Sequence, residues 1–229
     1  MQTIGLIGGM SWESSAAYYE GLNKGVQQRL GGLHSAKLVL ASVDFAEVME
    51  ALEQQRPADA GAQLAKAARG LEAAGADFIL ICSTTFHIVY DEVEAAVSVP
   101  VVHLADVVAD KCKASGITTV GFLGTAFTAE NDFFAQRLSD HGIDVNLPDP
   151  LHVETIDSII FDELVFRKVT TSSRRRVVGI IDELWDAGTD GVLLGATELS
   201  LLVRQQDVEV PVLDVITVGV EAALDRALA

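Results

Sequence analysis

Cysteine is scarce in this chain of 229 residues, which contains only Cys82 and Cys112. Two cysteines can form one bridge at most, and a single bridge is not the disulfide framework that stabilises small secreted domains. A hydrophobic fraction of 49% is large enough to build a sizeable core without such bridges. We therefore expect a protein of a reducing, cytoplasmic setting.

Basic residues are also few, with 16 Lys and Arg against 33 Asp and Glu and a formal net charge of -17. A broad nucleic-acid or anionic-membrane surface needs clustered positive charge, so we expect neither kind of partner. A small anionic ligand needs only a local pocket and stays compatible with this charge. No apolar run approaches the roughly 20 residues of a membrane span, and the first residues lack the basic start of a signal peptide.

Short apolar runs rich in Val, Ile and Leu alternate with longer helical patterns. Near-continuous hydrophobicity is typical of parallel strands that are covered on both faces. Between two of these runs, Leu64, Ala68 and Leu71 recur at the spacing of one helix face. The alternation predicts an α/β fold with mainly parallel sheets. The expected strands are 3–7, 36–42, 78–81, 99–103, 119–123, 191–194 and 210–215.

The chain also contains an internal repeat, in which three segments recur in the same order about 111 to 116 positions apart. The matched pairs are 3–8 with 119–124, 74–84 with 187–197, and 99–103 with 210–214. The repeat predicts two pseudo-twofold-related, three-layer α/β domains with an active-site cleft between them. We expect the first domain to comprise residues 1–100 plus 211–229, and the second to comprise residues 101–210.

Small or polar residues follow four of the expected strands, at 8–11, 83–85, 124–125 and 195–198. Open α/β sheets bind ligands beyond the carboxyl ends of their strands, so these segments are the candidate site. By the repeat, Ser83 and Ala196 occupy equivalent positions, and we expect them on opposite walls of the cleft.

The glycine-rich turn at 5–9 does not fit G-x-G-x-x-G, so a dinucleotide cofactor is not expected. Its glycines serve either a tight turn or a carboxylate site at a helix start. The hydroxyls of residues 83–85 fit a helix cap and a carboxylate cradle equally well. The position of His87 is typical of a packed or hydrogen-bonded structural residue. His34 and His103 are not spaced with cysteines or acids as metal ligands are, and we expect no metal.

The two cysteines are not strong candidates for chemistry. Strand alternation turns Cys82 away from the face that Ser83 uses, which predicts a buried structural thiol. Cys112 stands between Lys111 and Lys113, and we expect it on the surface of a helix.

Several of these stretches together resemble the aspartate/glutamate racemase family. The segment GLIGGMSWES at 5–14 is similar to the opening signature of that family, and the resemblance spans nearly the whole chain. Weaker pieces are GGLHS at 31–35, SVDF at 42–45, VPVVHLAD at 99–106, GFLGT at 121–125 and GATE at 195–198. The resemblance implies a homodimeric racemase that uses no cofactor and acts on a small amino acid or dicarboxylate.

In that family two cysteines flank the substrate Cα, and one removes the α-proton while the other protonates the opposite face. The resemblance puts Ser83 at the first thiol position and Ala196 at the second, which makes these the implied catalytic positions. We expect the ligand to be held by residues of the four strand ends. They are Gly9, Met10, Ser11, Thr84, Thr85, Thr125 and Thr197.

A serine hydroxyl is a poor base without an activator, and alanine carries no proton at all. Three explanations remain. Ala196 is an engineered replacement of a racemase cysteine, or the chain is a catalytically impaired relative that only binds its ligand. The third is another reaction on this scaffold, such as a decarboxylation or an isomerisation. Related enzymes that catalyse such reactions also use a cysteine, so Ser83 and Ala196 do not favour this third explanation.

Overall fold

The computed structural model describes residues 1–229, and the chain divides into two compact units. Unit 1 comprises Met1–Leu104 and Gly219–Ala229, and unit 2 comprises Ala105–Val218. The chain therefore changes units after Leu104 and after Val218, later than the expected positions near 100 and 210. The second change is later because residues 212–214 pair with the sheet of unit 2.

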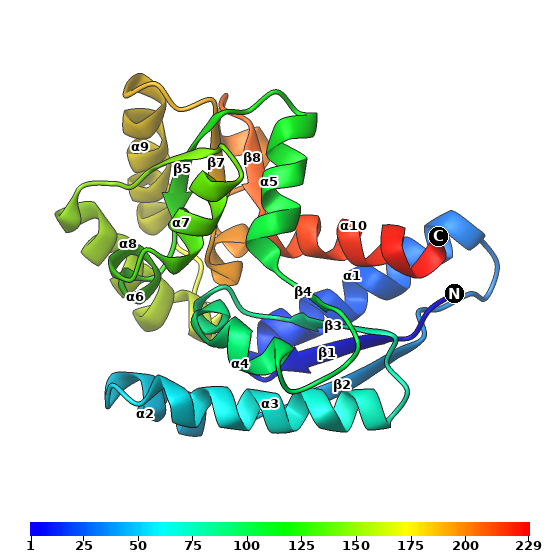
Figure 1. Ribbon diagram of the computed structural model, residues 1–229. Coiled ribbons are helices and arrows are strands. Elements are labelled where there is room, and N and C mark those ends of the chain that lie inside the picture. Colours follow the sequence, from blue (N-terminus) through cyan, green and yellow to red (C-terminus); the bar gives the residue numbers. More distant parts are fainter. The chain divides into compact units, whose positions relative to one another are not determined.

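Each unit contains one four-stranded sheet, and all of its strand pairs are parallel (Figure 1). The order is β2-β1-β3-β4 in unit 1 and β6-β5-β7-β8 in unit 2, so the two units share one topology. The strands are β1 (Ile4–Gly8), β2 (Leu38–Ser42), β3 (Phe78–Ile81), β4 (Val101–Val102), β5 (Thr119–Leu123), β6 (Asp144–Asn146), β7 (Gly191–Leu194) and β8 (Val212–Asp214). The predicted α/β class with two parallel-sheet domains is confirmed.

The helices follow the strands in chain order. Those of unit 1 are α1 (Trp12–Leu30), α2 (Phe45–Glu53), α3 (Pro57–Ala73), the 3-10 helix η1 (Thr85–Val89) and α4 (Tyr90–Glu94). Those of unit 2 are α6 (Ala126–Glu130), α7 (Phe133–Asp140), α8 (Pro150–Asp162), η2 (Leu164–Phe166), α9 (Thr171–Asp186), η3 (Thr197–Leu201) and η4 (Gln205–Asp207). Helix α5 (Leu104–Ala114) leads from unit 1 into unit 2, and α10 (Val215–Leu228) leads back.

Helices cover both faces of the unit 1 sheet, with α2 and α3 on one face and α1 and α10 on the other (Figure 1). Helix α10 approaches α1 closely because α1 has glycines at the contact. A Cβ on Gly25 would collide with the Leu224 side chain, and one on Gly21 would lie 3.0 Å from Val220. Strands β1 and β3 are consequently buried along their whole length.

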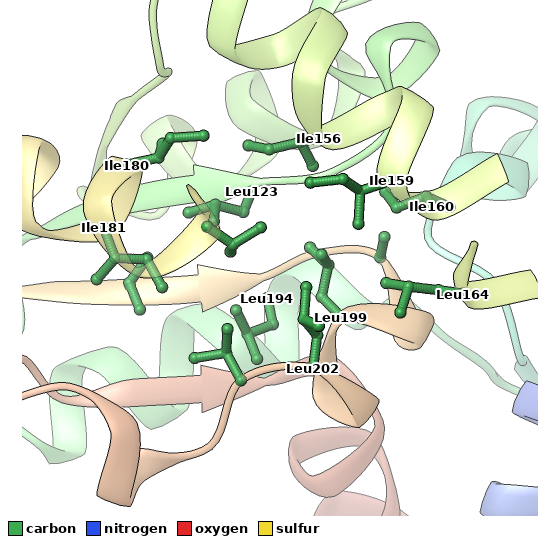
Figure 2. Close-up of a cluster of buried hydrophobic side chains, with 14 of the residues drawn as sticks. Leu123, Ile156, Ile159, Ile160, Leu164, Ile180, Ile181, Leu194, Leu199 and Leu202 are labelled. Atoms are coloured by element: carbon green, nitrogen blue, oxygen red, sulfur yellow. The ribbon is translucent and has the colours of Figure 1, made fainter. Parts of the chain in front are cut away.

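The core of unit 2 joins its sheet to α8 and α9 (Figure 2). Leu123 and Leu194 come from the carboxyl halves of β5 and β7, and they are buried with Ile156 of α8 and Ile181 of α9. Burying each such side chain stabilises the fold by roughly 1.5–3 kcal/mol. The strand ends that carry the unit 2 candidate residues are therefore well supported.

Two features differ from the sequence-based expectations. Strand β6 was not expected, because a short edge strand with an exposed Asp144 carries no apolar run. The predicted surface position of Cys112 is wrong, since its side chain is fully buried. Helix α5 turns Val108 and Cys112 inward, while Lys111 and Lys113 point to solvent. No helix combines the length and the apolar character that crossing a membrane requires.

Candidate active site

The candidate residues follow the strands at which the chain switches from one side of the sheet to the other. In unit 1 the chain passes from β1 to the neighbour β2 on one side and then to β3 on the other, so β1 and β3 flank a topological switch point. Strands β5 and β7 do the same in unit 2. Such points are where open α/β sheets bind ligands. Unit 1 places Gly9, Met10, Ser11, Ser83, Thr84 and Thr85 at its switch point, and unit 2 places Thr125, Ala196 and Thr197 at its own.

The equivalence of Ser83 and Ala196 is supported by matching backbone hydrogen bonds. The Cys82 N–H donates to the Ile7 carbonyl at 2.9 Å, and the Gly195 N–H donates to the Leu123 carbonyl at 2.7 Å. Cys82 and Gly195 are thus the same position in the two units. Ser83 and Ala196 follow them directly, just before η1 and η3.

The turn after β1 requires a glycine at position 9. Gly9 has a φ of +98°, and a Cβ there would collide with the Val43 carbonyl oxygen. Its N–H donates to Ser15 Oγ at 2.8 Å. The tight-turn interpretation therefore describes Gly9, and its amide is already engaged within the protein. The next peptide, between Met10 and Ser11, is cis.

Ser11 and Thr125 cap the helices that follow β1 and β5 in the same way. Ser11 Oγ accepts from the Ser14 N–H at 3.4 Å and lies 3.1 Å from Ser14 Oγ. Thr125 Oγ1 accepts from the Thr128 N–H at 3.3 Å and lies 3.0 Å from Thr128 Oγ1. A hydroxyl oxygen that accepts a capping bond keeps its own proton as a donor. Capping alone therefore does not exclude carboxylate binding at either position.

Thr84 is the exceptional side chain of the unit 1 site. Its hydroxyl oxygen is buried and has no hydrogen-bond partner, although it stands at the start of η1 where it could cap. The helix-cap alternative is thus not realised for Thr84. Leaving a buried hydroxyl unsatisfied costs roughly 1–3 kcal/mol, so this atom is suited to a polar ligand.

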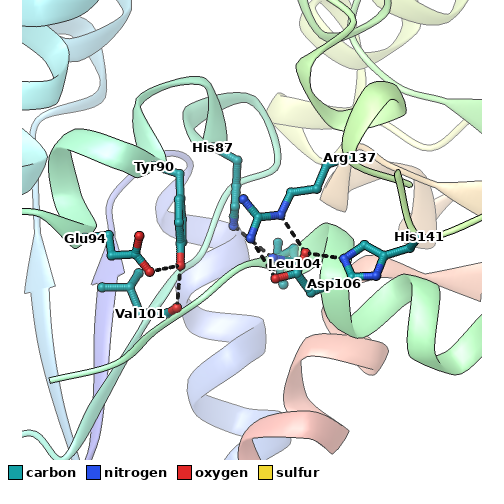
Figure 3. Close-up of polar contacts among 8 residues, drawn as sticks. All are labelled: His87, Tyr90, Glu94, Val101, Leu104, Asp106, Arg137 and His141. Carbon is teal, nitrogen blue, oxygen red and sulfur yellow. Dashed lines mark hydrogen bonds and ion pairs between the residues drawn. The ribbon is translucent and has the colours of Figure 1, made fainter. Parts of the chain in front are cut away.

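His87 bonds backbone groups that follow β3 and β4, and Figure 3 shows its contact with Leu104. Its Nδ1 lies 2.7 Å from the Ser83 carbonyl oxygen, and its Nε2 accepts from the Leu104 N–H at 3.1 Å. Because a carbonyl only accepts and an N–H only donates, the ring is neutral with its proton on Nδ1. His87 therefore bonds the backbone of Ser83, not its hydroxyl, and does not activate that hydroxyl as a base.

Neither cysteine compensates for the residues at 83 and 196. The Cys82 thiol is fully buried, and this burial raises its pKa far above the ordinary value. Burial also raises the pKa of Cys112 to about 11. Since the thiolate is the reactive form, neither thiol supplies a base near neutral pH. Ala196 offers only a methyl group.

This fold and these strand ends have counterparts among known proteins. The model of the Asp/Glu/Hydantoin racemase family matches residues 7–223. The chain belongs to this family.

Solved structures agree with this membership. The structure of a proposed Asp/Glu racemase from Yersinia pestis is 42% identical, with 100% of both chains covered and a TM-score of 0.94. That of an aspartate racemase homologue from Pyrococcus horikoshii OT3 is 32% identical, again over 100% of both chains, with a TM-score of 0.89. A glutamate racemase from Streptococcus pneumoniae (strain Hungary19A-6) is 27% identical over 152 residues. That match covers 64% of this chain and only 54% of the relative, so the chain spans about half of its length.

Asp106 is the last residue of the segment 99–106, and its side-chain partners could not be predicted from the sequence. Arg137 of α7 donates from Nε and Nη2 to the two Asp106 carboxylate oxygens at 2.5 and 2.8 Å, and His141 Nε2 lies 3.0 Å away (Figure 3). The three side chains are about one-third exposed. Such a bidentate pair fixes the first turn of α5 against α7 within unit 2. No sequence spacing signals it, because its partners come from a separate helix.

Proposed function

We propose that this chain binds a small amino or dicarboxylic acid, without a cofactor, at the residues that follow β1, β3, β5 and β7. We propose further that α-proton transfer on this scaffold needs a cysteine at position 196. As a consequence, the chain as it stands racemises aspartate and glutamate little or not at all.

The unsatisfied Thr84 hydroxyl is the observation that carries the binding proposal. It lies directly after Ser83, beside the strand end that carries Ser11, and a carboxylate or ammonium group would give it the partner it lacks. Ser11, Thr85 and Thr125 supply further hydroxyls at the same strand ends, whereas the Thr197 hydroxyl donates to the Glu198 carboxylate at 2.9 Å. Hydroxyl and amide donors of this kind are the ordinary partners of small carboxylates.

Racemisation requires two proton transfers, and the residues at 83 and 196 do not supply them. Inverting a Cα requires removal of a proton on one face and delivery of a proton on the other. Ser83 lacks an activating base, because both ring nitrogens of His87 bond backbone groups. A methyl at Ala196 neither takes nor gives a proton. A water in that place would lack the positioning that makes enzymatic proton transfer fast.

A second candidate is an active aspartate or glutamate racemase in which Ala196 replaces a natural cysteine. The matching backbone hydrogen bonds of Cys82 and Gly195 are compatible with it, because a cysteine at 196 would follow β7 as Ser83 follows β3. The racemase names of the relatives favour it. The unmodified coding sequence at codon 196 would separate the two candidates, because only the second requires a cysteine codon there.

Recognition of a second carboxylate needs a cation, and Arg167 is suited to that role. It ends η2, which packs against η3, the helix that begins at Thr197. Its φ of 55° and the bond from its N–H to the Leu164 carbonyl at 2.8 Å hold it in a tight, exposed turn. We expect Arg167→Ala to weaken aspartate and glutamate binding about tenfold, as loss of a charge-assisted hydrogen bond does, while Arg175→Ala on the exposed face of α9 leaves it unchanged.

The surface beside α1 supports the proposed homodimer. A groove of about 410 Å³ lies between α1 and residues 33–35, lined in part by Tyr19 and Leu33. Leu33 is fully exposed and Tyr19 half exposed. In a twofold dimer the same patch of both copies meets, so the exposed Leu33 of one copy could enter the groove of the other. Sedimentation equilibrium should show a dimer that Leu33→Asp dissociates; a monomer at all concentrations would contradict the proposal.

Isothermal titration calorimetry with both enantiomers of aspartate, glutamate and alanine tests the binding proposal. We expect at least one of these acids to bind, and Thr84→Val to weaken its binding. The matched control is Thr189→Val, a buried threonine in unit 2 whose hydroxyl donates to the Leu184 carbonyl at 3.1 Å. Equal affinity in the Thr84→Val variant and the unmodified chain would remove the basis of the proposal.

A further inference from the structure

We propose that Asp149, His152 and Glu183 form a binding site for a divalent transition metal in unit 2, with Zn²⁺ as the representative ion. The ligands would be one imidazole nitrogen and two carboxylates. Asp149 and His152 belong to the start of α8, and Glu183 belongs to the last turn of α9.

The spacing of the three ligand atoms fits a metal better than it fits hydrogen bonds. His152 Nδ1 lies 3.3 Å from Asp149 Oδ2 and 3.4 Å from Glu183 Oε2. A charge-assisted N–H···O bond is about 2.7–2.9 Å long. In contrast, a tetrahedral Zn²⁺ with bonds of about 2.1 Å separates its ligand atoms by about 3.4 Å. All three ligand atoms lie within 4.8 Å of one another, so small side-chain rotations would bring all of them to bonding distance of one ion.

The charges around the cluster favour a cation. The ion pairs of Asp149 and Glu183 are with His152 alone, so two carboxylates share one imidazole. The last turn of α9 contains no basic residue, although the carbonyl end of a helix attracts positive charge. A divalent ion would balance the charge of both carboxylates and of the helix end.

Asp149 is oriented before any metal arrives, and the two helices that carry the ligands are packed together. Asp149 Oδ1 accepts from the His152 N–H at 3.0 Å as the cap of α8, which leaves Oδ2 directed at the cluster. Helices α8 and α9 are packed together through the buried Ile156 and Ile180 (Figure 2). A carboxylate oriented by a second hydrogen bond is typical of metal sites, and the exposed side chains leave a path for the ion.

The cluster lies away from the residues of the proposed function. Helix α9 leads into the amino end of β7, whereas Ala196 follows the carboxyl end of that strand. The expected effect of the metal is therefore to clamp α8 to α9, and it is measured without substrate. Sequence spacing did not indicate the site because its third ligand comes from a different helix.

Calorimetric titration of the full chain with ZnCl₂ tests the inference, together with thermal unfolding in Zn²⁺ and in EDTA. We expect one site per chain and a Tm increase of roughly 3 °C or more when Zn²⁺ is about 100-fold above its Kd. Asp149→Asn, which preserves the helix cap, and Glu183→Gln should each weaken Zn²⁺ binding tenfold or more, as should His152→Ala.

Glu154→Gln is the matched control, because Glu154 is an exposed carboxylate on α8 outside the cluster. It should bind Zn²⁺ as the unmodified chain does. Two results would overturn the inference. One is the absence of Zn²⁺ binding at millimolar concentration. The other is binding that Asp149→Asn, His152→Ala and Glu183→Gln leave as tight as in the control.

Discussion

Replacing Thr84 by valine should have opposite effects on stability and on ligand binding. Valine keeps the size and branching of threonine and replaces the hydroxyl by a methyl group. In the ligand-free protein the Thr84 hydroxyl is buried and has no partner, a state that costs roughly 1–3 kcal/mol. Removing it should therefore raise the free energy of unfolding by about 1 kcal/mol, while the ligand loses a hydrogen-bond partner.

Thr189 makes the comparison quantitative. Its side chain is buried to the same extent, but its hydroxyl donates to the Leu184 carbonyl at 3.1 Å. That carbonyl also accepts from the Thr189 N–H, so it keeps one partner after the change. Thr189→Val should consequently destabilise the protein by only about 0.5–1.5 kcal/mol, the net value of one hydrogen bond.

Urea unfolding of the unmodified chain and of the two variants, without ligand, measures both effects. The slope of the free energy of unfolding against urea concentration should be the same for the three proteins. The unfolding midpoints then report the differences in stability directly. The reasoning is refuted if Thr84→Val destabilises the ligand-free protein as much as Thr189→Val does. That result would mean that the Thr84 hydroxyl already has a partner in solution.

Three further changes test other parts of the structure. His87→Phe should destabilise the protein by about 2–5 kcal/mol in urea unfolding, because two buried backbone groups lose their partners; a loss below 1 kcal/mol would contradict the assigned ring contacts. Gly195→Ala should lower the Tm, because a Cβ there collides with the Phe122 ring, and an unchanged Tm would show that the ring moves freely. The Ser98 hydroxyl, with backbone N–H groups, lowers the pKa of Glu72 from its ordinary value of 4.5. The stability from that carboxylate is present above pH 4.5 and lost as the pH falls through the lowered pKa, so Glu72→Gln should flatten the acid side of the stability curve.

Much of the fold followed from apolar runs and from the internal repeat. Seven of the eight strands lie within expected runs to within a residue, because a parallel strand buried on both faces must be apolar. The shared topology followed from segments that recur in one order. Strand β6 was not predicted because an edge strand of three residues needs no apolar pattern. Cys112 was misplaced because its charged neighbours lie on another face of α5.

The candidate site could be proposed from the sequence as a set of strand ends but not as a set of contacts. The positions of Ser83 and Ala196 follow from the repeat, and their matching surroundings appear in the structure. Nothing in the sequence shows that Ser15 engages the Gly9 amide or that Thr84 lacks a partner. Such facts depend on side-chain directions and on neighbours distant in the sequence.

Exchange of the α-proton with solvent deuterium tests the central claim most directly. Aspartate and glutamate of both configurations would be incubated in D₂O with the unmodified chain and with Ala196→Cys, alone and combined with Ser83→Cys. Proton NMR would follow the loss of the α-proton signal. We predict no exchange above background for the unmodified chain and measurable exchange once the thiols are present. Brisk exchange by the unmodified chain would contradict the account, because another residue would then be moving the proton.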